Sequence, residues 1–193
     1  LPTSINQSLI FVSKDFKKEK DSSNKFIYLF ENDPQHTYYL LLNAYFSKIS
    51  TGLVATTSKI HPNAKIGKNV QIDDFCVIEE CVIEDNVVIG SHSKIHKNSI
   101  IGKNSIIESM SVIGTSGVAW VWDKNQENKI LQTQLGGVEI GENCFLGANT
   151  ILVRGSINEN TIIGKNTFFA PGCRIGHGTI IGDYVHLANN VVT

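Results

Sequence analysis

Aliphatic side chains recur at every sixth position over most of the chain. The series shifts phase by one residue after Ile78, is interrupted after Ile113, and shifts again after Leu152. A period of six does not fit an α-helix, but it fits three short strands joined by tight turns, which form a triangular coil of about eighteen residues. The aliphatic positions are Ile60, Ile66, Ile72, Ile78, Ile83, Ile89, Ile95, Ile101, Ile107, Ile113, Ile140, Leu146, Leu152, Ile157, Ile163, Phe169, Ile175, Ile181 and Leu187.

A second position, four residues after the aliphatic one, carries a small or β-branched side chain. We expect both positions to point inward, and we expect Gly and Asn to occupy turns with unusual backbone dihedrals. The pattern therefore predicts a mainly β protein, a parallel β-helix of about six stacked coils. The second positions are Ala64, Val70, Cys76, Val87, Ser93, Ser99, Ser105, Cys144, Thr150, Thr167, Cys173 and Thr179.

Two segments depart from the repeat. Residues 1–55 contain two apolar runs and then a helical pattern that begins near Pro34, which predicts a small N-terminal α/β cap joined to a β-helix at residues 56–193. Tyr38, Leu41, Leu42, Tyr45 and Phe46 are expected on one face of that helix. Residues 115–137 leave the repeat as an inserted loop, either as part of a functional site or as an arm that clasps a neighbouring subunit.

Charge and composition exclude several classes of protein. Seventeen basic and 18 acidic residues give a net charge of −1, so neither nucleic acid nor an anionic membrane is an expected partner. The chain has no apolar run long enough to span a bilayer and no signal-like segment, so we predict a cytoplasmic protein. Because the chain starts at Leu1 and the repeat still runs at Thr193, we expect it to be part of a longer one.

Cysteine and histidine supply the candidate chemistry. Three of the four cysteines occupy inward positions and Cys81 lies at a phase shift, so the sequence supports neither zinc binding nor thiol catalysis. His177 follows Ile175 and Gly176, which places it at an exposed turn, where a neutral imidazole can accept a proton. Four other histidines are interpreted as solvated surface residues: His61, His92, His96 and His186.

A family resemblance rests on three segments: TQLGGVEIGENCFLGANTILVRGS, TIIGKNTFFAPGCRIGHGTIIGDYVHLANNVV, and HPNAKIG at residues 61–67. They resemble the UDP-3-O-acylglucosamine N-acyltransferase family of lipid A biosynthesis, whose β-helix is left-handed. The resemblance extends over nearly the whole chain. It implies that His177 is the general base. It also implies that Phe30, Asp33 and His36 hold a uracil ring, although Asp33 before Pro34 also fits a helix cap. We further assign the insertion residues Trp120, Trp122 and Gln134, and Arg154, to substrate binding.

The sequence also departs from that family. Ala170 and Pro171 stand where the family has an Asp-Asn pair, and Val153 replaces an aspartate ahead of Arg154. These differences favour a related amino sugar, rather than the lipid A precursor itself, as the substrate.

The resemblance implies transfer of an acyl group from acyl carrier protein or a coenzyme A thioester to the amine of a nucleotide-linked amino sugar. No permanently bound cofactor and no metal are expected. We predict a homotrimer, because clefts between three packed prisms offer the concavity that one prism lacks. Two alternatives stay open. The first is a non-catalytic sugar-binding or assembly protein of the same fold. The second is a zinc-dependent enzyme like the carbonic anhydrases of similar coil, but the spacing of His92 and His96 gives this alternative little support.

Overall fold

The computed structural model describes residues 8–17 and 26–193. It divides the chain into two units, Leu1–Lys48 and Ile49–Thr193. We predicted the boundary at residue 55, but residues 50–55 already hydrogen-bond to the solenoid. Ser50 Oγ donates to Asn69 O at 2.6 Å and Ala55 N donates to Ile72 O at 2.8 Å, so the second unit begins earlier than the six-residue period does.

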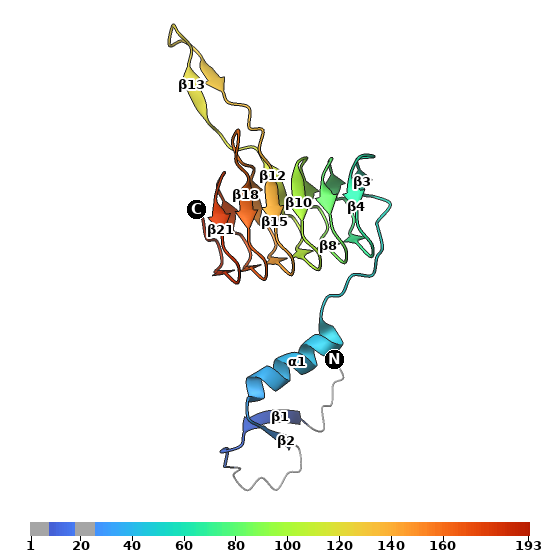
Figure 1. The fold of residues 1–193 in the computed structure, drawn as a ribbon. Coiled ribbons are helices and arrows are strands. Elements are labelled where there is room, and N and C mark those ends of the chain that lie inside the picture. The colour runs from blue at the N-terminus through green and yellow to red at the C-terminus, as the bar shows by residue number, and fades with distance from the viewer. Residues whose placement is uncertain (1–7, 18–25) are drawn as a thin grey trace. The chain divides into compact units, whose positions relative to one another are not determined.

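The second unit is a left-handed parallel β-helix with three six-stranded faces, which confirms the predicted fold class (Figure 1). Face 1 comprises β3 (Lys59–Ile60), β6 (Val77–Ile78), β9 (Lys94–Ile95), β12 (Val112–Thr115), β17 (Ile151–Val153) and β20 (Arg174–Ile175). Face 2 comprises β4 (Lys65–Ile66), β7 (Val82–Ile83), β10 (Ser99–Ile101), β15 (Val138–Ile140), β18 (Thr161–Ile163) and β21 (Ile180–Ile181). Face 3 comprises β5 (Gln71–Ile72), β8 (Val88–Ile89), β11 (Ile106–Ile107), β16 (Phe145–Leu146), β19 (Phe168–Phe169) and β22 (His186–Leu187).

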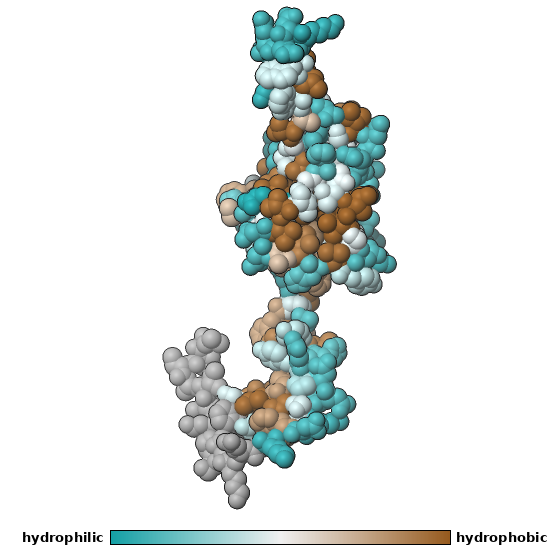
Figure 2. Space-filling model, turned by 90° about the vertical axis from the view of Figure 1, so that its left-hand side faces the viewer, coloured by the Kyte–Doolittle hydropathy of each residue, from teal (hydrophilic) through white to brown (hydrophobic). Residues whose placement is uncertain are grey.

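The periodic aliphatic residues form a continuous core along the axis of the solenoid. From Ile72 to Ile113 every predicted member is buried, because consecutive coils stack the same position of the hexad on itself. The first phase shift is absorbed by a shortened turn between β6 and β7, which leaves Cys81 buried in the core. Apolar side chains also gather on the outer surface between polar ones (Figure 2).

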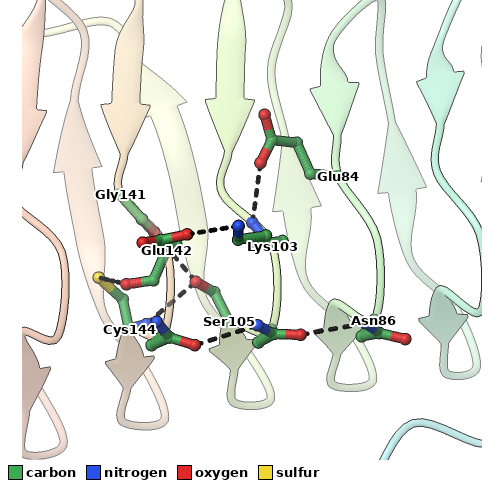
Figure 3. Close-up of polar contacts among 9 residues, drawn as sticks. Glu84, Asn86, Lys103, Ser105, Gly141, Glu142 and Cys144 are labelled. Atoms are coloured by element: carbon green, nitrogen blue, oxygen red, sulfur yellow. Dashed lines mark hydrogen bonds and ion pairs between the residues drawn. The ribbon is translucent and has the colours of Figure 1, made fainter.

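Asparagine stabilises one column of turns, as the sequence predicted. Asn69, Asn86, Asn104 and Asn143 adopt left-handed backbone with φ between 52° and 60°. Each side-chain amide donates to the next along the axis, at 2.9 Å from Asn69 to Asn86, 3.0 Å from Asn86 to Asn104 and 3.1 Å from Asn104 to Asn143. Figure 3 shows part of this column, near the Lys103–Glu142 ion pair of 2.9 Å.

A second column of turns has bulkier residues in the same conformation. Phe75, His92 and Met110 have φ of 61°, 62° and 63°, and Asn149 continues the column with φ of 60°. Left-handed backbone costs a side chain such as Met about 1–2 kcal/mol, whereas Asn tolerates it. These turns therefore retain strain that the asparagine column avoids.

Met110→Asn is expected to raise the free energy of unfolding by about 0.5–1 kcal/mol, because it relieves part of that backbone strain at an exposed position. Denaturant titration of the full chain measures the change. Met110→Leu, which keeps an unbranched Cβ and the strain, is the matched control and should leave stability unchanged. A loss of stability in Met110→Asn would show that the contacts of the Met110 side chain stabilise the protein by more than its backbone strain destabilises it.

The first unit contains a parallel pair, β1 (Ser8–Ser13) and β2 (Phe26–Glu31), followed by α1 (Pro34–Phe46). Asp33 caps the helix, since its Oδ1 accepts from His36 N at 2.9 Å, and Pro34 lies in the first turn as expected. No helix residue is buried in this unit. The predicted apolar face of α1 is therefore covered only in part, with the ring of Tyr38 5.6 Å from that of Phe11.

Candidate functional site

His177 lies at the turn between β20 and β21, where face 1 meets face 2. Its side chain is 53% exposed, as the sequence predicted, and its Nδ1 is 3.3 Å from Glu159 Oε1. Gly176 and Gly178 flank it, and Gly178 is left-handed with φ of 67°. An exposed imidazole with a carboxylate at one nitrogen leaves its other nitrogen free to accept a proton from a bound molecule.

Glu159 comes from a short loop of the preceding coil that the sequence analysis did not identify. Residues 154–160 connect β17 to β18 and replace a tight turn. We predicted that Ile157 would point into the core, and this was wrong: Ile157 is 52% exposed, and Thr161 is the buried residue after the loop. The loop leaves the coil, so a residue that fits the six-residue period by number does not follow it in space.

The base of the insertion holds this loop. The Ser156 carbonyl accepts from Leu135 N at 2.6 Å and from Gly136 N at 3.0 Å. Asn160 Oδ1 accepts from Gly137 N at 2.7 Å, and Asn160 Nδ2 donates to Glu139 Oε1 at 2.6 Å. The insertion and the carboxylate beside His177 are thus connected by hydrogen bonds that no periodicity reveals.

The insertion is an antiparallel hairpin that projects from the coils (Figure 1). It consists of β13 (Trp120–Trp122) and β14 (Lys129–Leu131). Trp120 and Trp122 are 42% and 49% exposed and pack edge to face at 5.2 Å between ring centroids. Lys129 Nζ lies 4.0 Å from the centre of the Trp120 ring, a cation–π contact. The hairpin therefore presents exposed aromatic surface beside Lys129, and in the described part of the chain no hydrogen bond or ring contact joins the tryptophans to His177.

Gln134 and Arg154, both predicted to bind substrate, are buried at the base of the hairpin. The Arg154 guanidinium donates from Nε to Gly114 O at 2.8 Å and from Nη2 to Lys97 O at 2.9 Å. Gln134 Oε1 accepts from Gly117 N at 2.6 Å, while its Nε2 has no hydrogen-bond partner within the described ranges. Gln134 thus joins the two arms of the insertion to each other, and Arg154 joins the end of β12 to the preceding coil.

His96 is not the simple surface histidine that we expected. Its Nδ1 lies 3.4 Å from Glu79 Oε2, and Lys94 Nζ lies 3.1 Å from the other oxygen of that carboxylate. Partial burial lowers the pKa of His96, which disfavours the imidazolium. His92 instead stacks on Phe75 at 5.0 Å, and residues 8–17 and 26–193 contain no group of three side chains that could hold a metal.

The residues assigned to uracil lie in the first unit. Phe30 is 47% exposed near the end of β2, Asp33 caps α1, and His36 is exposed in its first turn. Of these three residues, Asp33 contributes to the wall of a hollow of about 770 Å³, together with Phe11, Gln35 and Tyr38. Neither Phe30 nor His36 lines this hollow. The capping interpretation of Asp33 is confirmed, and a role in binding a base stays a prediction.

The cysteines are buried and free, as expected for core residues. Burial raises the pKa of the Cys81 thiol to about 12, and the nearby Glu79 carboxylate adds to this. Burial also raises the pKa of Cys76 and Cys144. A thiol is a poor nucleophile when so little of it is thiolate.

The native protein at pH 8 is therefore expected to leave all four cysteines unmodified by a thiol reagent, with four equivalents reacting after denaturation. Mass spectrometry after brief alkylation, with and without guanidinium, provides the measurement. Rapid labelling of Cys81 in the folded chain would contradict the burial described here.

Three family models match parts of the solenoid. Residues 47–121 match the GMPPB C-terminal domain, residues 137–158 a hexapeptide repeat of succinyl-transferase, and residues 160–193 a bacterial transferase hexapeptide of six repeats. Together with the three parallel faces, these matches show hexapeptide repeats in a left-handed β-helix fold.

Curated relatives support the resemblance stated from the sequence, but over about two fifths of the chain rather than nearly the whole of it. The UDP-3-O-acylglucosamine N-acyltransferase of Shewanella denitrificans is 34% identical over 80 residues, which cover 42% of this chain and 23% of the relative. The enzyme of the same name from Pseudomonas paraeruginosa is 36% identical over 76 residues, covering 39% of this chain and 21% of the relative. The chain thus spans less than a quarter of the length of the curated relatives that it matches.

Solved structures show the same fold. A UDP-N-acetylglucosamine acyltransferase from Bacteroides fragilis superposes with a TM-score of 0.55 at 28% identity, over 72% of this chain and 55% of that one. AntD, an N-acyltransferase from Bacillus cereus in complex with dTDP and 3-hydroxybutyryl-CoA, gives a TM-score of 0.56 at 18% identity, over 70% and 74% of the two chains.

The described part of this chain contains no helix that is both long and apolar enough to cross a bilayer.

Proposed function

We propose that this protein transfers an acyl group from a thioester to the amine of a nucleotide-linked amino sugar. The observation that carries the proposal is the exposed His177 imidazole beside Glu159, in a hexapeptide coil that is similar to those of sugar N-acyltransferases. His177 Nε2 accepts a proton from the amine as its nitrogen attacks the thioester carbonyl. The tetrahedral intermediate then expels the sulfur, which takes up the proton from the imidazolium.

The donor is an acyl carrier protein or a coenzyme A thioester, used as a co-substrate. AntD binds 3-hydroxybutyryl-CoA on a solenoid of the same fold, which supports a thioester donor here. The pantetheine arm would lie in a groove between adjacent solenoids of a homotrimer. Side chains that one solenoid leaves exposed on its faces favour such packing: Ile100, Phe145, Phe168 and Ile180.

The acceptor is an amino sugar related to, but distinct from, the lipid A precursor. Ala170 and Pro171 have no carboxylate or amide for the sugar hydroxyls that an Asp-Asn pair would bind. Within the first unit, the hollow at Asp33 is a candidate site for the nucleotide. A cytoplasmic location stays a prediction.

The second candidate is a non-catalytic sugar-binding protein of the same fold. Val153, Ala170 and Pro171 favour it, since all three replace polar residues of the similar enzymes. This protein would bind a nucleotide amino sugar without consuming a thioester.

A panel assay distinguishes the two. The full chain is mixed with acetyl- or 3-hydroxyacyl-thioesters of coenzyme A and of acyl carrier protein, and with each of several nucleotide amino sugars, while free thiol is measured. Thiol release that requires one amino sugar supports the acyltransferase. Saturable binding of a sugar in calorimetry without thiol release from any donor supports the binding protein and contradicts the enzyme.

A further inference from the structure

We propose that Glu159 is a positioning residue for His177: its carboxylate accepts the Nδ1 proton and so makes Nε2 the basic nitrogen. The catalytic part of this inference rests on the proposed function, whereas the tautomer of the neutral His177 ring is a property of the free protein. In the neutral ring one nitrogen donates and the other accepts, and the partner of one nitrogen decides the role of the other.

The contact has the geometry that this role requires. His177 Nδ1 is 3.3 Å from Glu159 Oε1, and the same oxygen accepts from Ser156 N at 3.3 Å. The backbone of its own loop thus holds the carboxylate in place. Both side chains are about half exposed, so the pair contributes little to stability. Its effect on the imidazole is therefore separable from an effect on folding.

Gly178 leaves the space that the carboxylate occupies. A Cβ built on Gly178 would lie 2.6 Å from Glu159 Oε1, closer than such atoms approach, and φ of 67° at this residue also disfavours a side chain. Gly178 N donates to Thr161 Oγ1 at 3.0 Å, which fixes the turn of His177 against the end of the loop. The positive φ of Gly178 and its bond to Thr161 thus place the turn of His177 beside the end of the loop that carries Glu159.

The hairpin base fixes the other side of the loop. Gly155 N and Thr161 N, at the two ends of the loop, both donate to Gly137 O, at 3.0 and 3.1 Å. Together with the bonds from Leu135 and Gly136 to the Ser156 carbonyl, these contacts connect the insertion to Glu159 through backbone groups. The insertion therefore contributes to the site by setting the position of the carboxylate.

Nitrogen-15 NMR of the full chain tests the tautomer without any substrate. Above the titration range of histidine, the His177 ring of the native protein should carry its proton on Nδ1, and Glu159→Ala should return it to the Nε2–H form that free histidine prefers in water. His177→Ala assigns the signal. Glu127→Ala, at the exposed turn of the hairpin, is the matched control and should leave the spectrum of His177 unchanged.

Kinetics supply the second readout. Glu159→Ala should lower kcat about tenfold with little change in KM, a smaller effect than loss of the base. Glu159→Gln, whose amide oxygen still accepts from Nδ1, should recover most of this loss. An Nε2–H tautomer in the native protein, or identical spectra for native and Glu159→Ala proteins, would overturn the inference. A correct tautomer in a protein that releases no thiol would instead contradict the proposed function alone.

Discussion

Replacing His177 with Ala is expected to lower the rate of thioester-dependent acylation by about a hundredfold or more, the contribution typical of a general base. The imidazole is exposed and Glu159 is its one polar partner among the described residues, so the substitution should leave the free energy of unfolding nearly unchanged. Steady-state thiol release with the best acceptor of the panel gives the rate, and denaturant titration checks the fold.

His186→Ala is the control, because His186 is another exposed histidine of the last coils and points outward from β22. It should retain the activity of the native chain. Equal activity in His177→Ala and His186→Ala would remove His177 from the mechanism, whereas loss in both would indicate that the assay reports the stability of the last coils.

Arg154→Ala is expected to lower the free energy of unfolding by about 2–4 kcal/mol, since it removes a buried guanidinium and leaves the carbonyls of Gly114 and Lys97 without their donor. Equilibrium denaturation measures the change. Arg174→Ala provides the control, because Arg174 is exposed on β20 and its substitution should change stability by no more than about 0.5 kcal/mol.

The same pair of variants distinguishes structure from binding at Arg154. If Arg154 instead binds substrate, as we predicted from the sequence, then Arg154→Ala will raise KM while stability stays close to that of the native protein. The structure predicts the opposite order of effects, with the loss of stability as the primary change.

The sequence predicted the solenoid well because the same position of the hexad is buried in successive coils and therefore requires an aliphatic side chain each time. Ile72, Ile89 and Ile107 are buried for one reason, which the six-residue period states directly. The asparagine turns follow in the same way, since one residue type satisfies one backbone conformation in successive coils. Local and repeated constraints of this kind can be read from spacing.

The candidate site was only partly predictable because its contacts are not periodic. The position of His177 at a turn follows from the period, but Glu159 approaches it through a loop that the hairpin base holds by backbone hydrogen bonds. Ile157 shows the converse error, since it fits the count of residues but lies on that loop. Arg154 could not be assigned from the sequence for another reason. The carbonyls of Gly114 and Lys97, to which its guanidinium donates, are distant in sequence, so only the folded chain shows these hydrogen bonds.

The most direct test of the account is the amino-sugar dependence of thiol release by the full chain. The account predicts that one nucleotide amino sugar accelerates thiol release from an acyl-thioester, that the sugar recovered carries the acyl group on nitrogen, and that His177→Ala abolishes the acceleration. A folded native protein that releases thiol from no donor with any amino sugar of the panel would contradict it.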